Sequence, residues 1–358
     1  MDFFPAQQGE KFVLHMAGPP VQLPPGVPNL GGPRGQTLRE IDLAGNSIRE
    51  TNVDRVNEML TEMGKEEIYF FHHDTRYLPN GHLLVMAGVE RVLDDVQGDG
   101  PVDVVGDMII DLNENLEVEW AWDSTAGDPK LPLTRRARRD ELCGGLCGPL
   151  RKNILPDGTI IDAHDWTHGN AVTYTRDRNI IVSFRHQDWV VKVDYQDGQG
   201  TGNVLWRLGE EGDFDLVQTG PSDPNPWFSG QHQPLLYPKN PDWDEMVVYD
   251  NANALNEPPP SPGIFKNSRG QVYQLQETGN KLHAKLVTNS DLQVFAPFLG
   301  SAQKLANGNY HFLSGGGIDI NFLPIPNSPF PAGSSNSTEV NSKGEIVYSL
   351  HTPGVVTY

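Results

Sequence analysis

The feature that most constrains the fold is a hairpin pattern that recurs along the whole chain. Asn-Gly or Asp-Gly precedes an apolar run in YLPNGHLLVMAG, LPDGTIIDAHDW and LANGNYHFLSGG. These dipeptides supply the positive φ angles that tight hairpins require. Two strands flank a polar turn in DMIIDLNENLEVEWAWD and in GQVYQLQETGNKLHAKLV. In the first of these segments, Val118, Trp120 and Trp122 show the two-residue period of a strand. The pattern predicts many short antiparallel strands.

The paired hairpins recur at roughly 40–60 residues, the spacing of the four-stranded blades of a β-propeller. Five copies are visible, at 1–53, 68–123, 167–208, 232–288 and 300–351. We therefore expect an all-β, six-bladed β-propeller that forms a single domain over residues 1–358. In this expectation 1–53 supplies the first blade or closing strands, and terminal strands complete the sixth blade. The alternative fold is a β-sandwich with irregular hairpins.

Two segments have helical character and are predicted to be short helical insertions, 54–66 and 133–143. The second contains four arginines within LTRRARRDELC. This basic block either attracts an anionic substrate through its local field or is simply a solvated helix face.

Composition excludes several classes of function. Lysine and arginine number 27 against 47 aspartates and glutamates, so the net charge is 27 − 47 = −20. A nucleic-acid binder needs cationic surface, so no nucleic-acid partner is expected. No run of 18 apolar residues is present, and no transmembrane helix is expected. The 37 glycines and 29 prolines fit a chain with many turns.

The N-terminus and the cysteines leave the compartment open. MDFFPAQQGEKFVLHMAG has no basic segment followed by an apolar one, so no signal peptide is recognised. The chain is then either cytoplasmic or the mature form of an exported protein. Cys143 and Cys147 have Cys-x3-Cys spacing, whereas zinc and thioredoxin-like sites usually have Cys-x2-Cys. They form either a local disulfide or two thiols.

Several of the 11 histidines occupy corresponding places in different repeats. In a propeller the first strand of each blade lines the central channel, so residues at the start of these strands would converge. The positions concerned are His72, His73, His164, His168, Arg185, His186 and His232.

Two chemistries use such a cluster. Neutral imidazoles bind iron, copper or zinc, and an imidazole nitrogen can instead attack an electrophilic sulfur or phosphorus atom. Arg185 favours the second, because a guanidinium repels a metal cation but matches a sulfuryl or phosphoryl oxyanion. No Gly-x4-Gly-Lys-Ser/Thr loop is present, so a nucleotide donor is not supported. We expect no metal and no cofactor.

The order of the motifs resembles the bacterial arylsulfate sulfotransferase family over about residues 68–320. The motifs that carry the resemblance are HHDTRYLPNGHLLV, HDWTHGNAV, NIIVSFRHQDWVVKVD, VLWRLG, SGQHQPLL, VVYDNAN and GSAQKLANGNYHFL. The resemblance implies a six-bladed propeller that moves a sulfuryl group from an aryl sulfate ester to a phenol. The implied mechanism is ping-pong through a sulfohistidine, without a nucleotide sulfate donor.

The resemblance also implies roles for individual residues. His232 falls on the family's nucleophile, and His168, Arg185 and His73 fall on catalytic positions that hold the sulfuryl oxygens. One of these histidines would act as acid to the leaving phenolate and as base to the acceptor phenol. Asn170 would orient the site. His186 and His72 would assist substrate binding, and His72 is an alternative match for His73.

The resemblance further implies a periplasmic or secreted protein, and better-known members dimerise through an N-terminal β-domain. Residues 1–53 are too short for that domain, so a homodimer stays an open alternative, as does a cytoplasmic location. The cysteine pair corresponds to a disulfide near the site in some members. Two other functions stay open: a metal-dependent oxygenase with four histidines on iron, and a non-enzymatic propeller that binds a partner or glycan.

Overall fold

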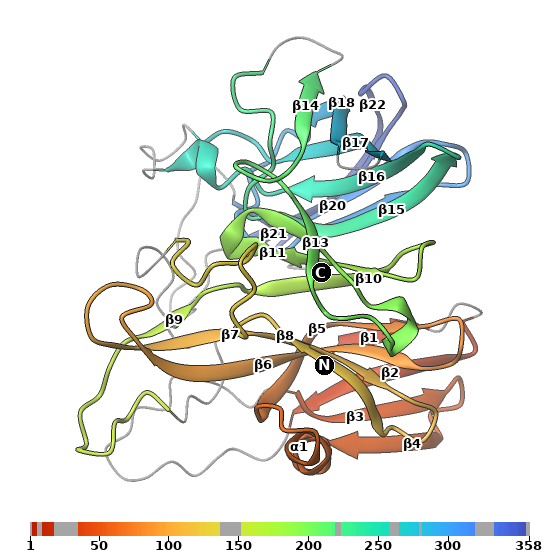
Figure 1. Cartoon of the computed structure of the whole chain (residues 1–358). Helices are drawn as coiled ribbons and strands as arrows, with labels where there is room; N and C mark the ends of the chain where they lie inside the picture. Colours follow the sequence, from red (N-terminus) through yellow and green to blue (C-terminus); the bar gives the residue numbers. More distant parts are fainter. Residues whose placement is uncertain are drawn as a thin grey trace. The chain divides into compact units, whose positions relative to one another are not determined.

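The computed structural model describes residues 2–5, 9–17, 35–136, 152–218, 223–257, 265–278, 281–318 and 333–355. Nearly all regular structure in this part of the chain is β-strand, with one α-helix (Figure 1). The all-β expectation is confirmed. None of the described helices has the length and apolar character needed to cross a membrane.

The chain divides into two compact units. The first comprises Met1–Val182 and Lys192–Leu205, and the second comprises Ser183–Val191 and Trp206–Tyr358. The strands of the third blade are divided between them.

Unit 1 contains the first two blades, each with four antiparallel strands. The first has β1 (Asp2–Pro5), β2 (Lys11–Ala17), β3 (Gly35–Asp42) and β4 (Ser47–Asn52). The second has β5 (Ile68–Tyr77), β6 (Leu83–Asp94), β7 (Pro101–Leu112) and β8 (Val118–Asp123). One residue pair, Gly35 with Phe71, joins β3 to β5, and β9 (Ala163–Asp165) lies parallel to β7. Together these strands form a nine-stranded sheet.

The third blade has its four strands in sequence order. They are β10 (Gly169–Tyr174), β11 (Ile180–Phe184), β12 (Trp189–Val193) and β13 (Val204–Leu208). Two short 3-10 helices, η1 (Arg185–Gln187) and η2 (Gln196–Gly198), follow β11 and β12.

Unit 2 contains the last two blades. The fourth has β15 (His232–Asn240), β16 (Trp243–Asp250), β17 (Arg269–Thr278) and β18 (Lys281–Asp291), and β14 (Asp215–Gln218) adds a parallel edge strand. A 3-10 helix, η3 (Ala254–Asn256), follows β16. The fifth blade has β19 (Ser301–Lys304), β20 (Tyr310–Ile318), β21 (Gly333–Val340) and β22 (Ile346–Pro353).

The described residues therefore form five propeller blades, and the prediction of six was wrong. A sixth blade required terminal strands that were available to form a new sheet. Instead β1 pairs with β2 inside the first blade, and β22 pairs with β21 inside the fifth. The described strands at both ends of the chain are thus used within blades that already exist.

The turn signals in the sequence identified real hairpins. Asn80-Gly81 lies between β5 and β6, and Asn307-Gly308 lies between β19 and β20. Gly81 and Gly308 both have φ of +87°. This is the conformation that glycine adopts at little steric cost, so the turn residues determine which strands pair.

The predicted helix near 54–66 is α1 (Val53–Glu62). Asn52 caps it, because its side-chain oxygen accepts a hydrogen bond from the Arg55 amide at 2.9 Å. Val56 and Leu60 are fully buried in the apolar core of unit 1 with strands of the first two blades. The second predicted insertion is a turn at 133–136, and the remainder of 133–143 lies outside the described residues.

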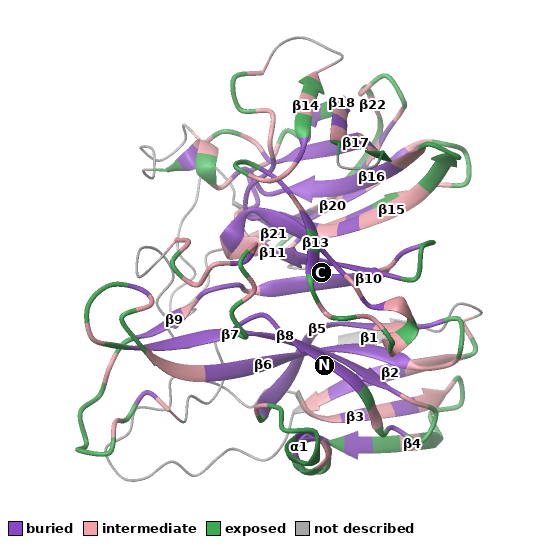
Figure 2. Ribbon diagram, in the orientation of Figure 1, coloured by how far each residue is buried: buried purple, intermediate pink, exposed green. Residues whose placement is uncertain are grey.

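Each unit has its own apolar core. In unit 1 Val85 and Ala87 of β6 pack with Met108 and Ile110 of β7, and in unit 2 a separate cluster contains Phe312. Figure 2 shows β7 buried along nearly its whole length. A strand buried on both faces places any polar side chain it carries in a low-dielectric setting.

Asp103 of β7 is such a residue. It is fully buried, as is Glu90 of β6, which accepts a hydrogen bond from the Lys152 amide at 2.7 Å. Burial, followed by the charge of Glu90, raises the pKa of Asp103 to about 9. The folded state therefore retains a proton that the unfolded chain releases near pH 3.8. As far as this carboxyl group is concerned, the native state is most stable below pH 3.8, where both states hold the proton. Its unfolding free energy then falls as the pH rises, until the folded state also loses the proton at about pH 9.

We expect Asp103→Asn to be stabilised relative to the wild type as the pH rises. Between about pH 5 and about pH 9 the difference in unfolding free energy should move in favour of the variant by up to about 1.4 kcal/mol for each pH unit. Urea titrations at several pH values measure it. A difference that does not change with pH would contradict the assignment.

Candidate active site

In unit 1, His72 and His73 lie on β5, and Asp107 lies on β7. His72 Nε2 is 3.1 Å from Asp107 Oδ1, and His72 Nδ1 is 2.8 Å from His73 Nδ1. His72 is buried and His73 is half-buried. Both nitrogens of His72 are thus engaged, so His72 links the carboxylate to His73. Of the two alternatives in the sequence, His73 is the better candidate for contact with a substrate.

The Asp107 carboxylate also fixes the start of β10. Its Oδ2 accepts from the Thr167 hydroxyl at 2.5 Å and from the Gly169 amide at 2.7 Å. A Cβ atom on Gly169 would lie 2.8 Å from Asp107 Cγ and 2.4 Å from Met86 Cε. Only glycine permits this approach. The glycine of the His-Gly-Asn motif therefore lets the Asp107 carboxylate bind a segment about 60 residues further along the chain.

His168 lies between these two anchored residues. Its Nδ1 is 2.5 Å from Asp165 Oδ2, and its ring centroid is 5.1 Å from that of His73. Asn170, the next predicted site residue, is buried on β10. Unit 1 thus brings His72, His73 and His168 together.

Carboxylates set the proton positions in this cluster. An ionised carboxylate only accepts hydrogen bonds, so His168 donates from Nδ1 and His72 donates from Nε2. With His72 neutral, its Nδ1 accepts from His73 Nδ1. His73 and His168 in their neutral forms then both carry the proton on Nδ1, which leaves Nε2 unprotonated in each. The arrangement suits proton exchange with a substrate.

In unit 2, Arg185 and His186 lie on η1, directly after β11. Arg185 Nη1 is 2.9 Å from His186 Nε2, and Nη2 donates to the Pro297 carbonyl at 2.6 Å. Since Arg185 can only donate, His186 Nε2 is the acceptor. One contact at each tip of the guanidinium fixes the plane of the fork.

A second set of bonds ties this segment to the start of β15. Gln231 is fully buried, and its Nε2 donates to the Phe184 carbonyl at 3.2 Å and to the Trp189 carbonyl at 3.0 Å. The Gly230 amide donates to Asp188 Oδ1 at 2.6 Å. His232 follows Gln231, and Arg185 follows Phe184. Unit 2 thus holds these two predicted site residues in one hydrogen-bonded framework.

His232 itself is 2% exposed, and its Nδ1 lies 2.7 Å from Asn251 Oδ1. The Asn251 amide nitrogen donates to the carbonyls of Ala296 at 2.6 Å and Leu299 at 3.0 Å. The segment 296–299 therefore contacts both Asn251, through these carbonyls, and Arg185, through Pro297.

Backbone strain accompanies the candidate residues in both units. His73 has φ of +51° and His168 of +45°, and Gln233, next to His232, has +44°. Non-glycine residues in this left-handed region cost of order 1–3 kcal/mol each, and they gather at functional sites.

The sequence reasoning missed several of these contacts. Asp107 interrupts the apolar run VVGDMII, and an acid inside an apolar strand is itself a signal. Asp165 precedes His168 by three residues, and Asn251 lies inside the quoted motif VVYDNAN. Cys143 and Cys147 lie outside the described residues, so their pairing stays a prediction.

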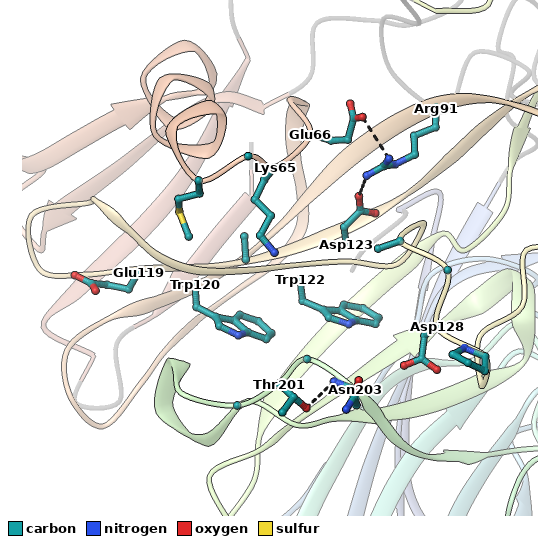
Figure 3. A pocket seen from close by; sticks show the side chains of 18 residues that line it. Lys65, Glu66, Arg91, Glu119, Trp120, Trp122, Asp123, Asp128, Thr201 and Asn203 are labelled. Atoms are coloured by element: carbon teal, nitrogen blue, oxygen red, sulfur yellow. Dashed lines mark hydrogen bonds and ion pairs between the residues drawn. The ribbon is translucent and has the colours of Figure 1, made fainter.

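Unit 1 also contains a cavity of about 750 Å³ that none of the predicted site residues line. Figure 3 shows Trp120 and Trp122 projecting from the same side of β8, as their two-residue spacing predicts. Arg91 is paired there, 2.6 Å from Asp123 and 3.3 Å from Glu66. The size is typical of a ligand pocket, but these charged groups pair with one another.

Comparison with solved structures gives distant likenesses. A protein of unknown function from Bacteroides caccae is 12% identical with a TM-score of 0.43, and the match covers 88% of this chain and 75% of that one. A DUF4221 family member from Bacteroides vulgatus is 10% identical with a TM-score of 0.39, covering 98% and 81%. These likenesses are too distant to carry an argument.

A comparison with curated proteins gives no match. The arylsulfotransferase (ASST) family, in contrast, matches residues 25–353, which is nearly the whole chain. This match confirms the resemblance that the motifs carried. Membership implies a sulfotransferase enzyme with small-molecule substrates. The chain belongs to the arylsulfotransferase family.

Proposed function

We propose that the protein transfers a sulfuryl group from an aryl sulfate ester to a phenol by a ping-pong mechanism, with His232 as the nucleophile and no nucleotide donor. One observation carries the proposal. The framework through Gln231, Asp188 and the segment 296–299 fixes a buried imidazole and an oriented guanidinium within unit 2. A nucleophile and a cation for sulfuryl oxygens are the two groups that this chemistry needs.

In the first half-reaction the lone pair of His232 Nε2 attacks the sulfur atom. The N–S bond forms as the bond from sulfur to the aryl oxygen breaks, and the phenolate leaves with that electron pair. In the second half-reaction the oxygen of the acceptor phenol attacks sulfur and gives up its proton. The N–S bond then breaks, and its electron pair returns to Nε2, which restores neutral His232.

Arg185 stabilises the group in transit. A guanidinium offers paired N–H donors that match two oxygens of a sulfuryl group. A fork whose plane is already fixed needs no reorganisation as charge shifts in the transition state.

For His73 and His168 the proposal keeps the roles that the family resemblance implies. One of them protonates the leaving phenolate and accepts the proton of the acceptor phenol. The support from unit 1 is that carboxylate hydrogen bonding, direct for His168 and through His72 for His73, holds the Nδ1 proton of both rings in place. Nε2 is then the atom that exchanges a proton with the substrates: it is protonated before the phenolate leaves, and once it has given up that proton it accepts the proton of the acceptor phenol.

The test is the release of 4-nitrophenol from 4-nitrophenyl sulfate, followed by colour, with and without added phenol and with EDTA in a parallel reaction. We expect phenol to accelerate release and EDTA to have no effect, because the acceptor discharges the sulfohistidine and the proposed steps use no metal. Loss of activity in EDTA, restored by a metal, would instead support the histidine-iron oxygenase alternative. No release with any acceptor would contradict the proposal.

A further inference from the structure

Asn251 is the residue that contacts His232 on its Nδ1 side. It directly follows β16, and the sequence reasoning gave it no role. Its side-chain oxygen is 2.7 Å from His232 Nδ1. The described contacts of its amide nitrogen are both with backbone carbonyls, those of Ala296 and Leu299.

These two carbonyls fix which way the Asn251 amide points. A carbonyl oxygen only accepts hydrogen bonds, so the group 2.6 Å from the Ala296 oxygen and 3.0 Å from the Leu299 oxygen must be the NH₂ end. The oxygen end then faces His232. A flipped amide would place oxygen against two carbonyl oxygens and NH₂ against the ring, at the cost of two hydrogen bonds.

The orientation of Asn251 determines the tautomer of His232. An amide oxygen only accepts, so His232 Nδ1 must carry the proton and donate it. In the neutral ring Nε2 then has the lone pair. Free neutral histidine favours the opposite tautomer, with the proton on Nε2, so the contact with Asn251 reverses the intrinsic preference.

The chemical nature of the partner also matters. A carboxylate in this place would stabilise the imidazolium form and raise the pKa of His232. A neutral amide fixes the tautomer without that effect. It also adds no negative charge beside a nucleophile that must attack an anionic sulfate ester.

The backbone around Asn251 is held in place for this contact. The Asp250 carboxylate accepts from the amides of Ser229 and Ala252, both at 2.8 Å, and it is ion-paired with Arg269 at 2.5 Å. Ala252 has φ of +62°, a strained conformation for a residue with a side chain. The Ser268 hydroxyl donates to the Asn251 carbonyl at 3.1 Å. Hydrogen bonds on both sides of Asn251 thus fix the strained turn that carries its side-chain amide.

We propose that Asn251 is a positioning residue that holds His232 in the Nδ1-protonated tautomer and so selects Nε2 as the atom that becomes sulfated. The second half of this statement rests on the function proposed above. The first half concerns only the tautomer of a buried histidine, and it can be tested without turnover.

The first experiment determines the tautomer in the full chain. Protein with ¹⁵N-labelled histidine is studied by long-range ¹H–¹⁵N correlation, and the His232 signals are assigned by their loss in His232→Gln. We expect the Nδ1–H tautomer in the wild type. In Asn251→Ala we expect the signals to move to Nε2–H, because the acceptor at Nδ1 is gone. Nε2–H in the wild type, or an unchanged Nδ1–H in Asn251→Ala, would overturn the proposal.

A matched control comes from Asn256, a second buried asparagine in unit 2. Its amide nitrogen donates to the carbonyls of Ala252 and Lys266, and its oxygen accepts from the Lys266 amide. Its described contacts involve no histidine, yet Asn256→Ala removes the same kind of hydrogen bonds. We expect it to lower the melting temperature comparably while His232 keeps Nδ1–H. A tautomer change in this control would assign the effect to general loosening and overturn the proposal.

A second variant tests the same contact with a different acceptor. Asn251→Asp loses the hydrogen bonds to the Ala296 and Leu299 carbonyls but keeps an acceptor at Nδ1, so we expect it to retain Nδ1–H. The acid limb of its pH–kcat profile should move upward, because the carboxylate raises the pKa of His232. Conversion of this variant to Nε2–H would also overturn the proposal.

Kinetics then connect the tautomer to the reaction. We expect Asn251→Ala to lower kcat by up to about 10⁴-fold, the loss seen when a catalytic histidine is held in the wrong tautomer. KM should change little, because the described contacts of Asn251 are within the protein. An unchanged kcat with a changed tautomer would remove Asn251 from the mechanism. Full activity of a His232→Ala variant would refute the proposed function while the tautomer result stood.

Discussion

Replacing His232 with alanine is expected to abolish sulfuryl transfer, with kcat lowered about 10⁴-fold or more, as for the loss of other covalent nucleophiles. Without the imidazole no N–S bond can form, and neither half-reaction can proceed. Initial rates with 4-nitrophenyl sulfate and phenol measure the loss. In the wild type, donor without acceptor should add the mass of one sulfuryl group to the peptide that contains His232, and the variant should show no such addition.

The His232 variant must also be shown to fold. One structural cost is the unpaired Asn251 oxygen, about 1–3 kcal/mol for a buried acceptor, and thermal unfolding should remain cooperative. His283→Ala is the control, because His283 is a half-buried histidine on β18 of the same unit. It should retain activity and the labelled peptide. Wild-type rates in His232→Ala would refute the nucleophile assignment.

Replacing Arg185 with lysine is expected to lower kcat about 10²- to 10³-fold, the usual cost of losing a preorganised oxyanion donor. The charge is kept, but a lysine ammonium cannot reproduce the planar fork that contacts His186 Nε2 and the Pro297 carbonyl. Saturation kinetics with an aryl sulfate give the change in kcat and in KM separately.

The matched control for this variant is Arg178→Lys. Arg178 is a largely exposed residue in a surface turn, and its side chain is 62% accessible. The same change in chemistry there should leave the kinetics as in the wild type. Wild-type rates in Arg185→Lys would show that a point charge is sufficient and would remove the fork from the mechanism.

Much of the secondary structure could be predicted because it depends on local signals. Asn80-Gly81 and Asn307-Gly308 form turns with positive φ, and each lies between two strands as expected. The helix at Val53–Glu62 begins at a capping asparagine, which is likewise visible in the sequence. These features involve neighbours only a few residues apart.

The contacts that organise the candidate site could not be predicted in the same way. Asp107 binds Gly169, Gln231 binds Phe184, and Asn251 binds Ala296 and Leu299, each across 45 or more residues. No local pattern shows which carbonyl a buried amide will reach. The prediction of six blades was wrong for a related reason. Whether terminal strands such as β1 and β22 pair within existing blades or form a new one depends on tertiary packing.

The left-handed conformations of His73 and His168 have a consequence for protein engineering. A glycine at either position would relieve torsional strain, but it would also delete the hydrogen bond to His72 or Asp165 and remove an imidazole from the proposed chemistry. Wherever the strain relieved exceeds the bond lost, a directed-evolution campaign that rewards heat resistance alone would accept glycine there and produce robust but inert proteins. Selection on turnover would be needed to keep the histidines in place.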